Sequence, residues 1–535
     1  MINHARQLFC LLLMLMISQG AIAPFCSAGE GEPAGFEITG FEVTGNTLFP
    51  EDKLREATVP FTGRGKTAAD VEKARDALEK FYHEAGYPAV MVNIPEQTLQ
   101  EGVVRLQVIE SRIGRVKITG NRYFTMEKMM RDLPSFTPGS ILYLPQVQKE
   151  LGRLNRSQDI KVDPVMTPGK ELGTIDVELK VEDRLPLHGY LELNNRASHD
   201  TSELRLSGMV RYDNLWQKEH SLSFQYLTSP LKAGEVEVLG ASYVLPAPWQ
   251  EDDQLALYGI KSDSDTSFVQ GFEGFNVIGK GKIFGTRYVT ALPDYRLYAH
   301  NLTLGLDYKQ FDQAVGFTTA SGQTTHTPIS YMPFSFSYSA SLPDEWGGMN
   351  LFNFGVNLNF RGVGSHEEQF EIARFKARAD YVYTTASFQR TQKLPRGMNL
   401  SVKVDGQSSG QPLVDNEQYV AGGMESVRGY KEAEASGDEA VHAMVEVSFP
   451  NPFEKSRIGK WFQMSPFLFY DMAELTIQDP LNQARHIALE GAGAGMRGSI
   501  AKNLEYELDW AMALDPTDRT KRNDKRGYFK LKAVF

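Results

Sequence analysis

Cysteine is nearly absent from this chain. Of 535 residues only Cys10 and Cys26 are cysteines, and both lie near the N-terminus. The chain beyond them has no thiol for a disulfide, a thiolate nucleophile or a Cys-ligated zinc site. Basic residues are also in the minority, with 56 Lys and Arg against 67 Asp and Glu and a formal net charge of -11. Because nucleic-acid phosphates demand a basic surface, this balance argues against a nucleic-acid partner.

Long apolar runs are missing after the N-terminus. The chain starts with a short basic segment, MINHARQ, followed by the apolar LFCLLLMLMIS and then small residues. This layout is typical of a secretory signal peptide, and the run is shorter than the roughly 20 residues that a spanning helix needs. Cleavage can fall after Ala23 or Ala28; we favour Ala28, which gives a signal peptide over residues 1–28. The rest of the chain fits a soluble protein or a transmembrane β-barrel, whose strands are only half apolar.

Two segments in the first third of the chain repeat each other. FEVTGNTLFPEDKLREA starts at Phe41 and VKITGNRYFTMEKMMRDL starts at Val116. Each combines a strand, a TGN turn and an amphipathic helix, and a second helix and two strands follow; in the first copy Thr67 and Asp70 form a capping box. We therefore expect two βααββ domains, over residues 36–111 and 112–184. A solenoid would need more than two copies.

After Asp183 the apolar pattern changes to a period of two. HNLTLGLDYK and LFNFGVNLNFRG, for example, place Leu, Phe and Tyr on one face and polar residues on the other. A soluble β-sandwich gives the same alternation. Three features favour a transmembrane barrel over residues 185–535. The region is long, its alternating segments approach the ~10 residues of a tilted spanning strand, and it contains no helical break. The chain also ends in a strand, GYFKLKAVF, as a closed barrel requires.

Other motifs carry no chemistry. GVGSH, Gly362 to His366, has its serine one place late for a hydrolase elbow and lacks the strand-turn-helix context. HEAGY contains His83 but no second histidine one turn later, so it is not a zinc helix. The acidic KSDSDTS lacks the spacing of a calcium loop. We predict no catalytic, cofactor-binding or metal-binding residue, and hence no enzyme.

Taken together, these features resemble a known family. Two TGN-type βααββ units before a long barrel resemble POTRA domains on an outer-membrane transporter. The segments TRYVTALPDYRLYAHNLTLGLDYK and QYVAGGMESVRGYKEAEASGDEA are similar to those of the haemolysin and filamentous-haemagglutinin secretion transporters. FYDMA, Phe469 to Ala473, is similar to the F-x-D-x-G element of that family. These proteins are the channel partners of two-partner (type V) secretion.

The resemblance implies a fold and a function. It implies about 16 antiparallel strands, an even number as in bacterial outer-membrane barrels, preceded by two α+β POTRA domains. It implies an unfolded exoprotein that binds the POTRA domains in the periplasm and leaves through the barrel of a Gram-negative outer membrane. We expect a monomer without a cofactor. An insertion factor for outer-membrane proteins, with a BamA-like architecture, is the alternative, although such factors usually carry more POTRA units; a porin or a barrel enzyme is disfavoured.

The resemblance also implies site residues. Val427, Arg428, Gly429 and Tyr430 form the VRGY motif of a loop that folds into the barrel. Strand alternation places Phe469 and Asp471 on the lumenal face, and a guanidinium can meet a carboxylate with two parallel hydrogen bonds. We therefore expect Arg428 to dock on Asp471. Phe529, Leu531 and Phe535 form a terminal signal for the barrel-assembly machinery, with Lys530 and Lys532 facing the lumen.

Two departures from the family pattern stand out. Members often carry an N-terminal helix that plugs the pore, and no such helix fits between residue 28 and the first strand near Phe36. Ala473 replaces the last glycine of F-x-D-x-G, so we expect the local packing of the wall to differ.

Overall fold

The chain divides into two compact units between Asp183 and Arg184. The computed structural model describes residues 35–99, 101–250, 252–264, 268–270, 276–293, 295, 297–316, 324–364 and 366–535. The expected signal peptide, residues 1–28, and the segment considered for a plug helix lie outside them. No helix among the described residues is long and apolar enough to cross a membrane.

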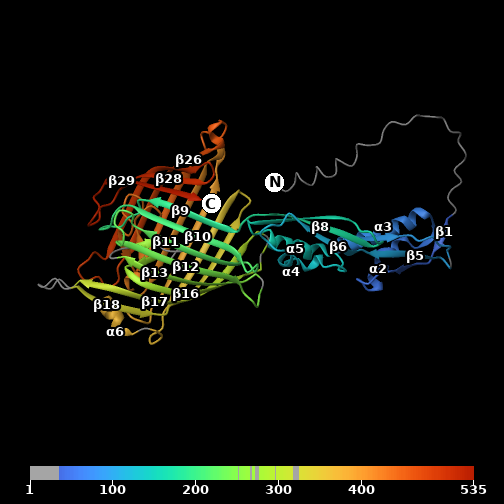
Figure 1. Ribbon diagram of the computed structural model, residues 1–535, viewed down its shortest axis with the longest axis horizontal. Coiled ribbons are helices and arrows are strands. Elements are labelled where there is room, and N and C mark those ends of the chain that lie inside the picture. Colours follow the sequence, from blue (N-terminus) through green and yellow to red (C-terminus); the bar gives the residue numbers. More distant parts are fainter. Residues whose placement is uncertain are drawn as a thin grey trace. The chain divides into compact units, whose positions relative to one another are not determined.

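The first unit starts with a small α+β fold, drawn in blue in Figure 1. Its sheet has the order β2-β5-β4, with β2 parallel and β4 antiparallel to β5. The elements are β1 Phe36–Ile38, β2 Gly40–Thr44, α2 Glu51–Thr58, β3 Gly63–Lys66, α3 Ala68–Glu84, β4 Val90–Asn93 and β5 Val103–Glu110. One face of the sheet packs on the helices through a core that includes Leu54, Leu78 and Leu106. The capping box of Thr67 and Asp70 starts α3.

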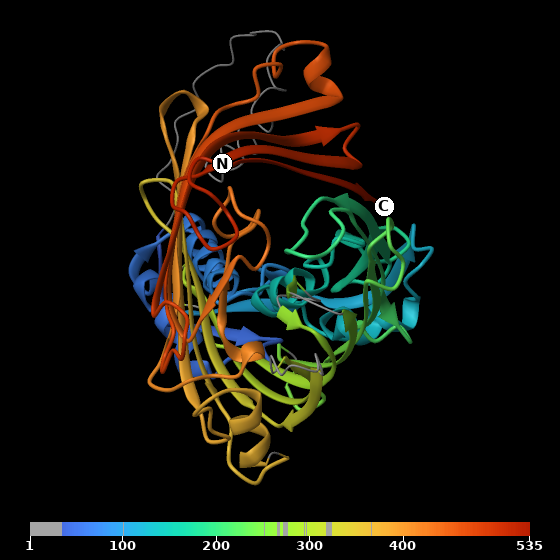
Figure 2. The same cartoon turned by 90° about the vertical axis from the view of Figure 1, so that its left-hand side faces the viewer.

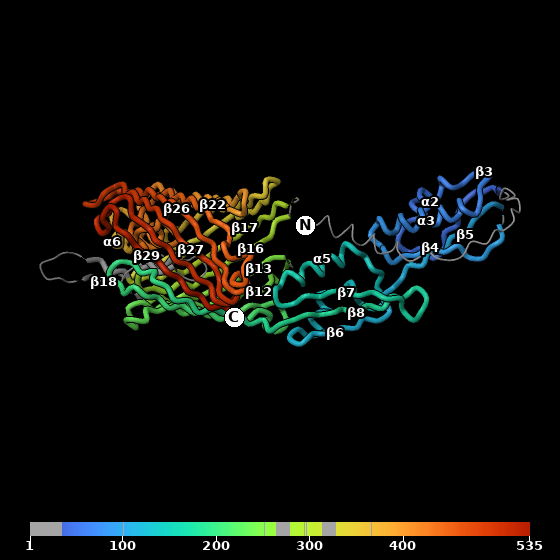
Figure 3. Tube along the Cα trace, turned by 90° about the horizontal axis from the view of Figure 1, so that it is seen from above, coloured from blue at the N-terminus to red at the C-terminus, as the bar shows by residue number. Residues whose placement is uncertain are grey.

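The second half of this unit repeats the topology. Its sheet has the order β6-β8-β7, again with a parallel and an antiparallel neighbour of the central strand. The elements are β6 Arg112–Thr119, α4 Met126–Asp132, α5 Leu144–Leu154, β7 Ile160–Pro168 and β8 Thr174–Asp183. Figure 3 traces α5 along β7 and β8, and its Val147 and Leu154 belong to the apolar core. The sequence repeat is thus a structural repeat.

The TGN turns owe their glycine to the backbone. Gly45 and Gly120 both have positive φ, 80° and 89°. A Cβ atom would lie 2.3 Å from the Val108 carbonyl oxygen at Gly45 and 2.2 Å from that of Val181 at Gly120. A side chain is therefore excluded at both turns by conformation and by space.

The second unit is a closed antiparallel barrel, green to red in Figures 1 and 2. Its strands are β9 Leu187–Asn194, β10 Arg205–Leu215, β11 His220–Thr228, β12 Val236–Pro246, β13 Gln254–Ser264, β16 Lys280–Ala291, β17 Ala299–Gly316, β18 Thr324–Tyr331, β19 Phe334–Pro343, β20 Gly348–Leu358, β21 Val382–Lys393, β22 Asn399–Ser409, β25 Glu439–Ser448, β26 Phe462–Thr476, β27 His486–Ile500, β28 Leu504–Ala513 and β29 Lys525–Val534. Because β18 and β19 both pair with β17 and form one interrupted strand, the barrel has 16 strands among the described residues. The predicted fold class is confirmed.

Alternation along the strands separates the two faces of the barrel wall. On β17, Leu304 is 51% and Tyr308 38% exposed, whereas Asp307 between them is 5% exposed. The exposed apolar side chains therefore form the outer face and Asp307 lies on the lumenal face, as expected for a barrel in a bilayer.

The expectation of no helix after Asp183 was wrong. A short helix, α6 Glu367–Ala373, lies in the loop between β20 and β21. Its seven residues span about two turns, which is too short for a helical period to stand out in the sequence. Its one buried residue, Phe370, belongs to an apolar cluster described below.

The last strand supplies a test of the two faces. Leu531 is 39% exposed on the outer face. On the lumenal face, the Lys530 Nζ lies 2.7 Å from Glu507 and the Lys532 Nζ lies 4.4 Å from the Tyr190 ring centroid. An outward charge costs about 2–4 kcal/mol at the bilayer midplane and less near the interfaces.

We therefore expect Leu531→Arg to lower the amount of folded barrel sharply in outer-membrane fractions, measured by heat-modifiable migration in gels. Lys532→Gln is the control and should leave that amount unchanged. Equal levels of the two variants would contradict the assigned faces.

Candidate functional site

The site is built around a loop that turns back into the barrel. This lumenal loop, residues 410–438, joins β22 to β25 and contains the short strands β23 Tyr419–Ala421 and β24 Ala435–Gly437. Figure 2 looks into the ring of strands and shows an orange segment after β22 inside it. Val427, Arg428 and Tyr430 are all 3% exposed or less, so the VRGY motif is packed against the wall.

Arg428 binds Asp471 of β26 in the geometry expected from the sequence. Its Nε and Nη2 donate to the two carboxylate oxygens, at 2.7 and 2.8 Å, and its backbone N–H donates to Oδ2 at 3.1 Å. The side chains are 3% and 0% exposed. Burial lowers the pKa of the Arg428 guanidinium, but hydrogen bonding and charge attraction from Asp471 raise it by more, so the net shift is upward. The arginine therefore stays charged.

Aromatic rings and a second charged pair surround this contact. The Arg428 Cζ lies 3.4 Å from the Phe469 ring centroid, a cation–π geometry. Its Nη1 donates to Glu446 of β25 at 3.3 Å, and Glu446 also binds Arg497 of β27. The Oδ2 atom of Asp509 on β28 lies 3.9 Å from Arg428 Nη1. Phe469 and Asp471 thus meet Arg428 as expected, while Glu446, Arg497 and Asp509 were missed.

A row of glycines on β27 makes room for the loop. In the register of β26 and β27, Gly491 faces Asp471 and Gly493 faces Phe469. A Cβ atom on Gly491 would lie 1.8 Å from the Arg428 carbonyl oxygen. A side chain there would push the loop off the wall. The sequence GAGAG at residues 491–495 has a glycine at each lumenal position. This pattern is the signal that could have identified the place where the loop approaches the wall.

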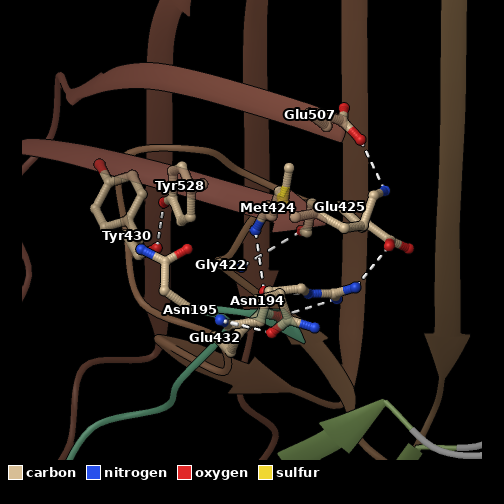
Figure 4. Close-up of polar contacts among 12 residues, drawn as sticks. Asn194, Asn195, Gly422, Met424, Glu425, Tyr430, Glu432, Glu507 and Tyr528 are labelled. Carbon is tan, nitrogen blue, oxygen red and sulfur yellow. Dashed lines mark hydrogen bonds and ion pairs between the residues drawn. The ribbon is translucent and has the colours of Figure 1, made fainter. Parts of the chain in front are cut away.

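The rest of the motif binds the last strands. Tyr430 Oη donates to the Asp515 carbonyl at 2.7 Å, and Tyr528 Oη donates to the Tyr430 carbonyl at 2.6 Å. Tyr528 Oη also accepts the Gly429 N–H at 2.8 Å; Figure 4 shows the two tyrosines next to each other. Gly429 has φ of 110°, and a Cβ there would lie 2.8 Å from the Ala513 nitrogen. Here too glycine is required.

Ala473 lies in the same packing. It is 2% exposed and belongs to an apolar cluster with Val427, Tyr430 and Leu489. The methyl group that replaces the motif glycine therefore packs in one cluster with side chains of the loop and of the wall. The expected difference in packing from other family members stays a prediction.

A second arginine, Arg196, binds the lumenal loop on both sides of the VRGY motif. Arg196, just after β9, donates from Nε to Glu432 at 2.9 Å and from Nη1 to Glu425 at 2.6 Å. Figure 4 shows both glutamates at this contact. The Glu432 N–H donates to the Ala197 carbonyl at 3.2 Å. The loop is thus tied to the segment after the first strand as well as to β26–β29.

A third anchor lies on the facing wall. Glu417 of the loop is 3% exposed and accepts hydrogen bonds from Lys309, Tyr331 and Tyr383 at 2.6, 2.7 and 2.9 Å. These donors belong to β17, β18 and β21. The loop therefore crosses the lumen from this wall to β26. A polar cavity of about 420 Å³ remains beside it, with Arg287, Lys403 and Asp405 in its lining.

The terminal signal residues do not join this site. Leu531 and Phe535 are 39% and 61% exposed at the end of β29. Their role in assembly rests on the outer face of the strand and stays a prediction.

The barrel, the paired α+β repeat and the docked loop define a class, the outer-membrane transporters with POTRA domains. The chain belongs to the haemolysin secretion/activation protein ShlB/FhaC/HecB family, whose model matches residues 173–498. The model of the ShlB-type POTRA domain matches residues 36–111. It is thus an outer-membrane transporter of two-partner secretion, an assignment that fits these findings better than a BamA-like insertion factor does.

Similar proteins agree with this assignment. The outer membrane transporter CdiB of Dickeya dadantii (strain 3937) is 23% identical over 414 residues, 76% of this chain and 70% of that protein. The heme/hemopexin transporter protein HuxB of Haemophilus influenzae (strain Rd) is 18% identical over 489 residues, 87% and 81% of the two chains. The structure of CdiB from Escherichia coli has a TM-score of 0.64 at 17% identity and covers 96% of this chain and 93% of that one. BamA from Haemophilus ducreyi, lacking POTRA domains 1–3, has a TM-score of 0.56 at 14% identity, covers 94% and 100%, and shares the fold.

The buried ion pair gives the next prediction. Removal of one partner leaves the other charge unpaired inside the wall, which costs about 3–5 kcal/mol. We expect Arg428→Ala and Asp471→Ala each to release the loop and strongly reduce secretion while the barrel stays inserted. The double variant should be little worse than either single one, since the two residues act together.

Secreted protein in the medium and folded barrel in the membrane are the two measurements. Arg519→Ala removes an exposed pair with Asp200 and is the control. Normal secretion by Arg428→Ala at unchanged barrel levels would rule out the docking role.

Proposed function

We propose that this transporter secretes one partner exoprotein, which reaches the POTRA domains unfolded in the periplasm and leaves through the barrel. The family supports this proposal, and so does the closed barrel with a loop across its lumen. The chain acts as a monomer in the Gram-negative outer membrane, without nucleic acid or cofactor. The domains are a signal peptide over 1–28, POTRA domains over 36–111 and 112–184, and the barrel over 185–535.

The POTRA sheets suit an extended client. A strand added to a sheet edge binds through backbone hydrogen bonds and requires no defined sequence. Not every edge is open to such a strand: β7 contains Pro164 and Pro168, which lack an N–H group. On β4 the Val92 N–H already binds Glu79 at 3.0 Å. At the other edge of the second sheet, Ile113 of β6 already exchanges backbone hydrogen bonds with Ser140 and Gly139. We therefore assign the client to β2, Gly40–Thr44, at the remaining edge of the first sheet.

Assembly of the transporter itself uses the last strand. Phe529, Leu531 and Phe535 alternate along its outer side, and the strand closes the barrel by pairing with β9. The barrel-assembly machinery is the partner that would recognise this strand. The proposed function is transport and involves no catalytic step.

The receptor role is tested by deletion. Without residues 36–111 the client loses its proposed edge, so we expect secretion to be abolished while the barrel, a separate compact unit, still inserts. The measurements are exoprotein in the medium and heat-modifiable barrel in the membrane.

Amounts of other outer-membrane proteins provide the control. If the deletion lowers them and leaves secretion intact, the insertion-factor alternative is favoured. Normal export by the deletion variant would contradict the receptor role.

A further inference from the structure

The lumenal face of the barrel is apolar at one end. At the end where β9 stops and β10 begins, here called the distal end, the inward residues of neighbouring strands are Val236, Val238, Ile260, Ile283, Phe311 and Ile329, each 6% exposed or less. Phe311 shares its face of β17 with Asp307 and Lys309, so parity places it in the lumen. Lumenal residues of an open, water-filled barrel are polar. These side chains must therefore be covered by another part of the chain.

The cover comes from the loop that carries α6. Phe370 of this helix is 0% exposed, and its ring centroid lies 5.4 Å from that of Tyr331 on the barrel wall. Ala377 and Ala379, further along the same loop, are also 0% exposed and belong to the cluster. Leu413 and Val414 of the lumenal loop complete it. Residues 366–381, here called the plug, thus cover the apolar part of the lumenal wall at the distal end.

One carboxylate ties the plug to its neighbours. Asp438, the last residue of the lumenal loop before β25, is 0% exposed. Its Oδ1 and Oδ2 accept from Arg374 Nη1 and Nη2 at 2.5 and 2.6 Å. They also accept the backbone N–H groups of Leu413 at 2.8 Å and Gln478 at 2.7 Å. The Arg374–Asp438 pair therefore joins the plug, the lumenal loop and the loop after β26.

Other ion pairs of the plug differ from this one. Lys376 binds Asp479 and Arg378 binds Asp380 at 2.8 Å, but the two basic side chains are 56% and 54% exposed, against 13% for Arg374. Exposed ion pairs contribute little to stability because water screens them, whereas breaking a buried pair leaves an unpaired charge and costs several times more. Among these ion pairs, the Arg374–Asp438 pair therefore contributes most to the stability of the docked plug.

We propose that residues 366–381 are a plug that closes the distal end of the barrel, and that the Arg374–Asp438 pair is the latch that opens for a passing polypeptide. The proposal rests on the transport function above, because an extended chain and the plug cannot occupy the same space. Further from the distal end the lumenal face is polar. Glu417, which accepts hydrogen bonds from Lys309 and Tyr331, lies where the apolar cluster meets this polar part of the lumen.

The test measures the pore without any client. Purified full-length protein is inserted into a planar bilayer and the fraction of time spent in a conducting state is recorded. Arg374→Ala removes the latch, and Phe370→Ala removes apolar packing without leaving a charge unpaired. Lys376→Ala and Arg378→Ala change neighbouring cations whose pairs are exposed.

We expect the conducting fraction to rise at least about tenfold in Arg374→Ala and to rise clearly in Phe370→Ala, because breaking a buried ion pair shifts the equilibrium between the closed and open states by more than that factor. The two control variants should match the wild type. Wild-type conductance in correctly folded Arg374→Ala and Phe370→Ala would overturn the proposal. So would a failure of both variants to insert, because residues 366–381 would then be part of the barrel core rather than a removable plug. A protein that conducts as expected but secretes nothing would count against the transport function alone.

Discussion

The contact between Arg428 and Asp471 is the interaction on which the rest of the site depends. Both groups are buried in the wall, so without its partner either one would be an unpaired buried charge. The wall is shaped around them: Phe469 offers its ring face, and β27 has glycine where the loop approaches. Glu446 and Arg497 extend the contact into a network of charges across β25, β26 and β27. A loop held in this way crosses the lumen and defines what space is left for a client.

The loop also bridges the place where the barrel closes. The register of β29 with β9 runs over the short stretch from Lys530 to Val534, whereas β26 and β27 pair along their whole length. On one side of this seam Tyr528 of β29 binds the loop at Tyr430, and on the other Arg196 binds it at Glu432. Closure of the barrel and docking of the loop are therefore coupled through shared contacts. The plug adds a further tie, because Asp438 joins it to the same loop.

Two regularities of the sequence predicted the fold: the alternation of apolar and polar residues and the repeat of the TGN segment. Strand alternation and the TGN repeat gave the barrel and the α+β pair, and parity placed Asp471 in the lumen, where Arg428 binds it. Glu446 and Asp509 were missed because a single inward carboxylate looks like any other polar lumenal residue until its partner is known. The plug was missed for a different reason: α6 has seven residues, and its apolar contacts come from strands far apart in the chain. Neither feature leaves a local pattern.

Docking of the lumenal loop in the resting transporter depends on Asp471. Hydrogen–deuterium exchange of peptides covering residues 422–431 tests it most directly, because the N–H groups of Arg428 and Gly429 donate to Asp471 and Tyr528. We expect slow exchange of these peptides in the wild-type protein and much faster exchange in Asp471→Ala, with the barrel strands equally protected in both. Fast exchange of this segment in the wild type, or unchanged protection in Asp471→Ala, would contradict it.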